Sequence, residues 1–107
     1  GLSAGQRQLV HLTRVFLRRP KIWLLDEPTS SMDRQTEQKL IQALSQNLRP
    51  TDTLVMATHK HELLALVDRL IVVANQEIVL DGPKNKVLER LQNPNPVTPI
   101  RQQAKSA

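Results

Sequence analysis

The stretch Ile22-Trp23-Leu24-Leu25-Asp26-Glu27-Pro28 decides the fold of this chain. Its first four residues form a continuous apolar run of strand length, which is typical of a strand covered on both faces of a parallel sheet. Two carboxylates, Asp26 and Glu27, follow at the carboxyl end of that strand. Because ligands of open α/β sheets bind outside the carboxyl ends of the strands, these residues fall where a site would be built.

Helix patterns flank this strand on both sides. Ser3 and Gln6 form a capping-box pattern, which predicts a helix from about residue 4 to about residue 17. Asp33 is the expected N-cap of a second helix that reaches about residue 48. One face of that second helix carries Leu40, Ile41, Leu44 and Leu48.

The sequence after the second helix continues the alternation of strand and helix. Residues 53–57 are expected to form another buried strand, which ends at Thr58-His59, and a short helix is expected over residues 61–67. The order strand, helix, strand, helix predicts a parallel α/β sheet.

The remaining residues predict a hairpin, a last helix and a tail. Residues 70–74 and 77–80 are expected to pair as a hairpin, and Asp81-Gly82-Pro83 is expected to turn into a helix that ends near Leu91. Residues 93–107 are polar and rich in proline, with too few apolar groups to offset the entropy of ordering them. We therefore expect this tail to be disordered.

The composition allows one small domain and excludes several classes of protein. The chain has 107 residues, of which 39% are hydrophobic. It has no cysteine, which excludes a disulfide framework, a thiolate metal site and thiol redox chemistry. No apolar run approaches the roughly 18 residues that span a bilayer. Because the first residue is Gly1 rather than Met and directly precedes a recognisable motif, we interpret the chain as a piece of a longer protein.

The net charge of +5 would allow binding to nucleic acid or to an anionic membrane surface. However, the basic residues are scattered along the chain, and an aromatic content of 2% leaves little for base stacking. We interpret the charge as a solvated surface and predict no nucleic-acid partner.

Three groups of residues carry possible chemistry, and each has a structural alternative. Asp26 and Glu27 can divide labour, one holding Mg²⁺ and the next accepting a proton from a water, or they can be an acidic turn. Residues 2–6 put small side chains and a hydroxyl at a helix N-terminus, which favours phosphate, although a capping box needs the same Ser3 and Gln6. His59 is either a ligand or a solvated loop histidine.

Taken together in this order and spacing, these motifs resemble the ATP-binding cassette (ABC) family over about residues 1–91. Leu2-Ser3-Ala4-Gly5-Gln6 is similar to the signature motif, and Ile22-Trp23-Leu24-Leu25-Asp26-Glu27-Pro28 to the Walker B strand. Thr29-Ser30-Ser31-Met32-Asp33 resembles the D-loop, and Thr58-His59-Lys60 resembles the switch-histidine segment.

The resemblance implies a fold and a set of roles. Residues 1–92 would be the C-terminal portion of a P-loop NTPase of the ABC type, which is an α/β domain with a mainly parallel sheet flanked by helices. Asp26 would position Mg²⁺, directly or through water, and Glu27 would be the general base for ATP hydrolysis. His59 would sense the γ-phosphate, and Asp33 would contact the partner subunit.

The signature residues would close over the ATP of an opposing subunit, so that two ATP molecules are held in a dimer. These residues are Ser3, Ala4, Gly5 and Gln6. The family most often has glycine where this chain has Ala4, and a methyl group there would keep the backbone further from a phosphate.

No G-x-x-x-x-G-K-[ST] phosphate loop occurs in the sequence, so we expect the chain alone to be inactive. The resemblance implies an upstream transmembrane domain and a location at the cytoplasmic face of a bacterial inner membrane. A looser similarity to type I secretion exporters, in residues 33–37, 58–60 and 81–88, implies a homodimer that moves a polypeptide with a membrane-fusion adaptor and an outer-membrane channel. The alternative function is that of a soluble ABC ATPase that acts on DNA or the ribosome.

Overall fold

The computed structural model describes residues 1–93 and 95–105, and these form two compact units. The first unit is Gly1–Leu66 and the second is Val67–Ala107. Within the described residues, no helix is long and apolar enough to cross a membrane. Each unit is described by itself below.

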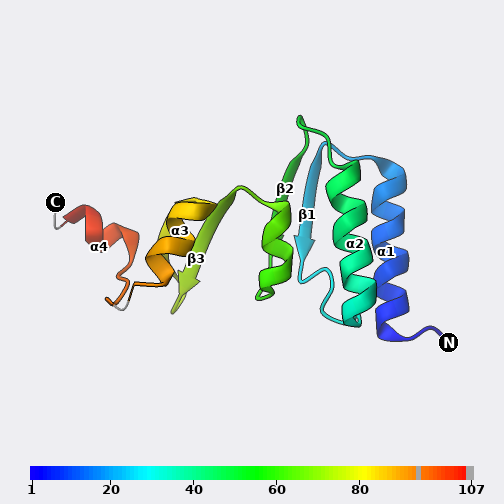
Figure 1. Cartoon of the computed structure of the whole chain (residues 1–107), viewed down its shortest axis with the longest axis horizontal. Helices are drawn as coiled ribbons and strands as arrows, with labels where there is room; N and C mark the ends of the chain where they lie inside the picture. Colours follow the sequence, from blue (N-terminus) through cyan, green and yellow to red (C-terminus); the bar gives the residue numbers. More distant parts are fainter. Residues whose placement is uncertain (94, 106–107) are drawn as a thin grey trace. The chain divides into compact units, whose positions relative to one another are not determined.

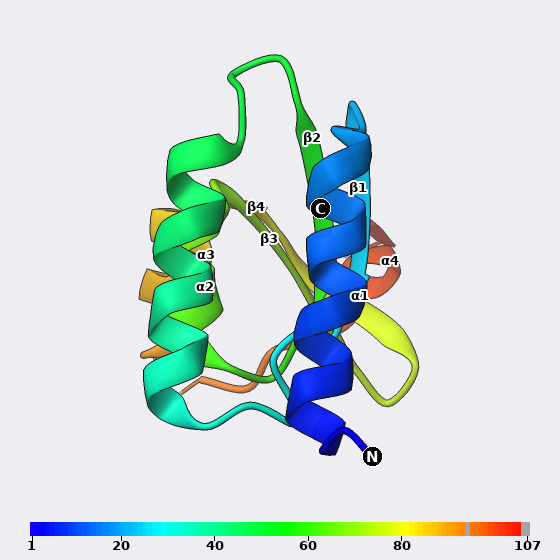
Figure 2. The same ribbon diagram turned by 90° about the vertical axis from the view of Figure 1, so that its right-hand side faces the viewer.

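The first unit is a parallel pair of strands with two helices on one side. Its elements are α1 (Ala4–Arg18), β1 (Ile22–Asp26), α2 (Arg34–Asn47), β2 (Thr53–Ala57) and the 3₁₀ helix η1 (His61–Leu66). Strands β1 and β2 pair in parallel, from Ile22 opposite Thr53 to Asp26 opposite Ala57. Helices α1 and α2 lie on the same side of this sheet (Figures 1 and 2). The predicted α/β order and parallel pairing are confirmed.

The caps of both helices follow the sequence pattern. Ser3 Oγ accepts from the Gln6 backbone N–H at 3.1 Å, and Gln6 Oε1 accepts from the Ser3 N–H at 2.9 Å, which completes the predicted capping box. Asp33 Oδ1 accepts from the Thr36 N–H at 2.7 Å and so caps α2 as predicted. Helix α1 ends at Arg19, whose left-handed backbone (φ 46°) places its N–H against the Phe16 carbonyl at 3.2 Å.

The core of this unit lies between the helices and one face of the sheet. Its buried residues are Leu12, Trp23, Leu40 and Leu44. The opposite face of the sheet is bare, because Leu24 in β1 is 75% exposed and Val55 in β2 is 54% exposed. The expectation that β1 is covered on both faces is therefore wrong for this chain, since both helices of the unit cover the same face.

The second unit is a hairpin with two helices. Strands β3 (Arg69–Ala74) and β4 (Glu77–Pro83) pair antiparallel, with a bulge at Val72/Val73. Asn75 and Gln76 link them with positive φ values of 51° and 65°, as a two-residue hairpin turn requires. The hairpin is confirmed, but Asp81, Gly82 and Pro83 extend β4 instead of forming the expected turn. Helix α3 (Lys84–Leu91) follows directly.

The tail was expected to be disordered, but it contains helix α4 (Ile100–Lys105). Two polar contacts hold this helix to β4. Arg101 forms an ion pair with Glu77, and the Gln103 amide donates to the Val79 carbonyl at 3.2 Å. The tail has few apolar groups, but its composition does not indicate that polar contacts order this helix. The parts of the expectation that concern residues 94, 106 and 107 lie outside the described residues.

A pair of leucine substitutions tests this distribution of burial. Leu44→Ala removes a fully buried side chain from α2 and should lower the free energy of unfolding by about 2–5 kcal/mol. Leu17→Ala removes a side chain of α1 that is 80% exposed, and it should change the free energy of unfolding by less than about 0.5 kcal/mol. Chemical denaturation of both variants measures the difference, and equal effects would contradict the assigned core.

Candidate functional site

Glu27 lies at the carboxyl end of β1 in an unusual backbone conformation. Its φ is 42°, in the left-handed region that costs a residue with a Cβ roughly 1–2 kcal/mol. The Glu27 N–H donates to the Ala57 carbonyl at 2.8 Å, which continues the pairing with β2 for one more residue. The strained turn therefore occurs where the sheet is still hydrogen-bonded and can hold it in place.

The Glu27 carboxylate is held by the segment that follows β2. Oε2 accepts from Thr58 Oγ1 at 3.2 Å, and Oε1 accepts from the His59 backbone N–H at 3.0 Å. The His59 ring lies further away, with Nε2 3.7 Å from Oε1, and its side chain is fully exposed. The parallel register thus brings together two residues that the sequence singled out, Glu27 and His59, with Thr58 as the additional contact.

Asp26 is the last residue of β1, and its side chain makes no hydrogen bond within the described part of the chain. A carboxylate of this kind suits Mg²⁺, which is commonly held by one or two carboxylates together with phosphate and water oxygens. Among the described residues, no group of three His, Cys, Asp or Glu side chains could hold a metal ion by itself. Asp26 therefore fits Mg²⁺ as one ligand of several, directly or through water.

The signature residues lie at the N-terminus of α1, and the structure gives Gly5 a packing reason. A Cβ at Gly5 would lie 2.5 Å from the Ser31 carbonyl oxygen, closer than atoms can approach. Any other residue would push the N-terminus of α1 away from the loop that contains Ser31. Ser3 and Ala4 are exposed beside it. The sequence predicts that small residues here leave room for a phosphate, and Gly5 also leaves room for this loop.

Gln8, which belongs to none of the predicted motifs, joins α1 to the loop after β1. Its Nε2 donates to the Glu27 carbonyl at 3.0 Å and to Ser30 Oγ at 3.3 Å. Its Oε1 accepts from the Ser31 N–H at 3.0 Å. Gln8 follows Gly5 by three residues and thus shares its helix face, which is the one signal that could have indicated it.

A second network that the sequence did not predict lies beneath the same loop. Glu37 in α2 is 3% exposed, and its Oε2 accepts from Thr29 Oγ1 and from Lys60 Nζ, each at 2.6 Å. Lys60 Nζ also donates to the Thr29 carbonyl at 3.1 Å. The hydrogen bonds from Lys60 and Thr29 hold the pKa of Glu37 below its ordinary value, so a charged carboxylate is kept under the loop.

Asp33 is exposed at the start of α2 and has a structural role. The Thr36 backbone N–H donates a hydrogen bond to the Asp33 carboxylate, and this bond holds the pKa of Asp33 below its ordinary value. This cap fixes the start of α2 directly after residues 29–33. A contact to a partner subunit stays a prediction.

Known proteins are similar to this chain in sequence and fold. The family model for ABC transporters matches residues 1–30. The multidrug resistance-like ATP-binding protein MdlB of Buchnera aphidicola is 38% identical over 89 residues, which is 83% of this chain. This chain belongs to the ABC transporter family. Its α/β fold is that of an ABC ATPase cassette, since the dimeric structure of the bacterial ABC transporter cassette MJ0796 matches with a TM-score of 0.67 at 30% identity.

Other comparisons agree with this ABC assignment and define its extent. The leukotoxin translocation ATP-binding protein LktB of a Pasteurella haemolytica-like species is 35% identical over 89 residues. The chain spans 15% of the length of MdlB and 12% of that of LktB. It covers 36% of the MJ0796 chain, while 77% of this ABC chain is matched there.

The Glu37 network predicts a pH dependence of stability. Because the folded-state pKa lies below the ordinary value of 4.5, the stabilisation is fully present above that value and is lost as the pH falls through the folded-state pKa. Glu37→Gln should lower the free energy of unfolding at pH 7 by roughly 1–3 kcal/mol, because hydrogen bonds to a charge are lost.

Denaturant unfolding of both proteins from pH 7 to pH 3 measures this effect. Other carboxylates with lowered pKa, such as Asp52 and Asp81, contribute equally to both proteins and cancel in the difference. The gap between wild type and Glu37→Gln should narrow as the pH falls. A gap that stays constant would show that the charge of Glu37 does not contribute.

Proposed function

We propose that this chain is the carboxyl part of an ATP-hydrolysing motor domain in an ABC exporter. The observation that carries the proposal is the Glu27 carboxylate, held by Thr58 and the His59 N–H at the carboxyl end of β1 in a chain of this family. A carboxylate has about four lone-pair sites, and two of them accept from these donors. The others can accept a proton from an attacking water, which is the role of a general base.

Asp26 and His59 support this role from either side of Glu27. Asp26 would hold Mg²⁺, and Mg²⁺, when bound, offsets the negative charge of phosphate oxygens. The exposed His59 ring is free to turn toward a γ-phosphate while its backbone N–H keeps Glu27 in place. One residue thus orients the base through its main chain and contacts the nucleotide through its side chain.

We propose that the N-terminus of α1 faces the ATP of a second cassette. Ser3 is the N-cap and Ala4, Gly5 and Gln6 lie in the first turn, where the positive end of the helix dipole favours an anion. The matched MJ0796 cassette is described as dimeric, and a second structure of it as a post-hydrolysis state bound to ADP and Pi. These descriptions support a homodimer with ATP between the subunits, and Asp33 would contact the partner.

The bare face of the β1–β2 sheet supports a larger domain. Leu24 and Val55 expose an apolar surface on this face, and the sequence contains no phosphate loop. A hollow of about 450 Å³, lined in part by Arg7, His11 and Leu24, lies beside this surface. We propose that the part of the cassette with the phosphate loop packs here, and that a transmembrane domain attaches the whole to the cytoplasmic face of a bacterial inner membrane.

We further propose that the complete protein is a type I secretion exporter. This proposal is supported by the similarity to LktB, whose name describes translocation of leukotoxin. Such an exporter would act with a membrane-fusion adaptor and an outer-membrane channel, and its cargo would be a polypeptide. Other relatives are named for other cargo, such as the ATP-dependent lipid A-core flippase of Syntrophus aciditrophicus, at 36% identity.

The chain by itself should neither bind Mg-ATP at micromolar concentration nor hydrolyse it. The reason is that the phosphate loop carries most contacts to the nucleotide in P-loop NTPases. Isothermal titration of the purified chain with Mg-ATP, together with a phosphate-release assay, measures both. Saturable micromolar binding, or turnover that depends on Glu27, would contradict the assignment of the nucleotide contacts.

Two neighbouring substitutions in the complete domain separate base from metal ligand. Glu27→Gln keeps Asp26 and the side-chain shape, so ATP binding should persist while hydrolysis falls on the order of 10²- to 10⁴-fold. ATP-bound dimers should accumulate. Asp26→Asn should weaken Mg-ATP binding, and added Mg²⁺ should partly restore it.

Gel filtration with Mg-ATP and a turnover assay compare these variants. Normal turnover in Glu27→Gln would overturn its role as the base. A defect in Asp26→Asn that does not respond to Mg²⁺ would overturn the metal role of Asp26.

A further inference from the structure

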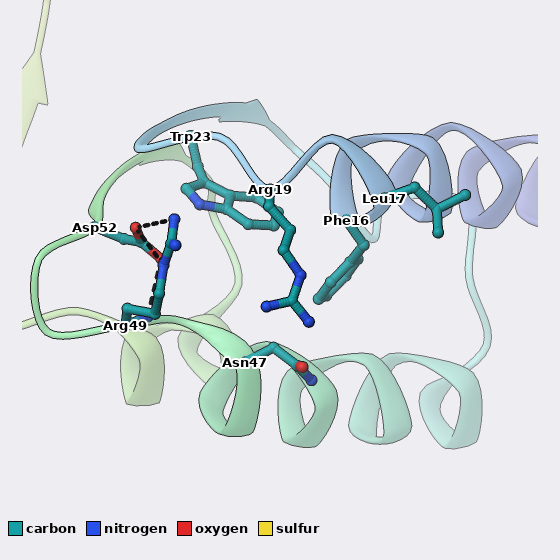
Figure 3. Close-up of a pocket in the computed structure, with 7 residues that line it drawn as sticks. All are labelled: Phe16, Leu17, Arg19, Trp23, Asn47, Arg49 and Asp52. Atoms are coloured by element: carbon teal, nitrogen blue, oxygen red, sulfur yellow. Dashed lines mark hydrogen bonds and ion pairs between the residues drawn. The ribbon is translucent and has the colours of Figure 1, made fainter.

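A hollow of about 240 Å³ lies at the opposite end of β1 from Asp26 and Glu27. It is formed by the end of α1, the start of β1 and the segment after α2 (Figure 3). Trp23 and Asp26 are three strand residues apart, or about 10 Å, so the hollow is separate from the proposed nucleotide site. Its volume is below the roughly 300 Å³ at which sites for drug-sized ligands begin, so it suits a smaller molecule.

Trp23 lines this hollow and has an unmade hydrogen bond. The residue is 3% exposed, and its Nε1 is the one buried side-chain N or O atom without a partner in the described part of the chain. A buried donor without an acceptor is costly, and the indole nitrogen can only donate. Figure 3 shows the nitrogen-bearing edge of the ring toward the Arg49–Asp52 pair. A ligand that satisfies this donor must supply a hydrogen-bond acceptor.

Two arginines border the same space, and only one of them is neutralised. Arg49 pairs with Asp52 through Nε at 3.1 Å and Nη2 at 3.0 Å. The Arg49 side chain is 47% exposed, so it can shift to admit a ligand to the indole edge. Arg19 is exposed, its side chain makes no hydrogen bond or ion pair within the described residues, and it lines the same hollow, with its guanidinium directed toward Phe16 and Asn47 (Figure 3). Arg19, Arg49 and Asp52 together carry one net positive charge, so the hollow favours a ligand with one negative charge.

The backbone of Arg19 also sets this position apart. Its φ of 46° is the left-handed conformation in which helices usually end with glycine. A residue with a Cβ is strained in this C-cap conformation, and the exposed Arg19 lines the hollow. Strained residues of this kind concentrate at binding sites.

The remaining wall is apolar. Phe16 and Trp23 pack edge to face, with ring centroids 5.3 Å apart and an interplanar angle of 74°. An inorganic anion would leave this wall without a contact, whereas an apolar group would cover it. A planar guanidinium matches the two oxygens of a carboxylate better than a single acceptor.

We propose that this hollow binds a small monocarboxylate with an aromatic or branched apolar body. The carboxylate accepts from the Arg19 guanidinium and from Trp23 Nε1, and the apolar body packs on Phe16 and the indole face. Binding leaves the Glu27 site unchanged.

The single tryptophan of the chain makes the test direct. The indole ¹H–¹⁵N resonance can belong only to Trp23. The ¹⁵N-labelled chain is titrated with benzoate, and in parallel with benzyl alcohol and with inorganic phosphate, at constant ionic strength. Benzoate should shift this resonance along a saturable curve. Benzyl alcohol has the aromatic ring without the carboxylate, and phosphate has the negative charge without the ring. Each should bind at least about 10-fold more weakly than benzoate.

Variants at Arg19 separate binding from folding. Arg19→Gln should weaken benzoate about 10-fold, while Arg18→Gln, a matched change of the neighbouring exposed arginine, should not. Arg19→Gly should abolish the preference for benzoate over benzyl alcohol without lowering the melting temperature, because glycine accepts the left-handed conformation without strain. This variant keeps the test valid if the glutamine variant unfolds.

Three results would overturn the proposal. The first is a shift that does not saturate, which would mean that water alone serves the indole N–H. The second is an equal response to benzoate and benzyl alcohol. The third is unchanged benzoate affinity in both Arg19 variants. Because the readout needs no nucleotide, and Glu27→Gln should bind benzoate like the wild type, failure here is distinct from failure of the proposed ATPase function.

Discussion

The parallel pairing of β1 with β2 is the constraint on which the candidate site depends. Because Asp26 lies opposite Ala57, the residues that follow the two strands leave the sheet at the same edge. Glu27 remains hydrogen-bonded to Ala57 for one further residue, and its side chain meets Thr58 and His59 there. A register shift of one residue would turn Glu27 to the other face and separate these groups.

The sequence predicted the elements of this arrangement because their signals are local. The capping box at Ser3, the N-cap at Asp33 and the apolar strand runs each depend on a few adjacent residues. The position of Glu27 near His59 was also predictable, since both follow buried strands. The roles of these residues rest on the family and on the experiments proposed, not on the fold.

The features that the sequence did not predict depend on contacts between distant residues. Glu37 and Lys60 are each ordinary surface residues by type, and only the fold shows that their charges are paired beneath Thr29. The bare face around Leu24 was missed for a related reason, because an apolar run has the same appearance whether its cover belongs to this chain or to another segment. The tail was missed because the ion pair of Arg101 with Glu77 links residues far apart in the sequence.

Gln8 has a consequence for how force passes through the domain. Its side-chain amide donates to the Glu27 carbonyl and accepts from the Ser31 N–H, while Gly5 packs against the carbonyl of the same serine. These contacts fasten the first turns of α1 to the loop after β1. A displacement of the N-terminus of α1 would therefore also shift the main chain that carries Glu27.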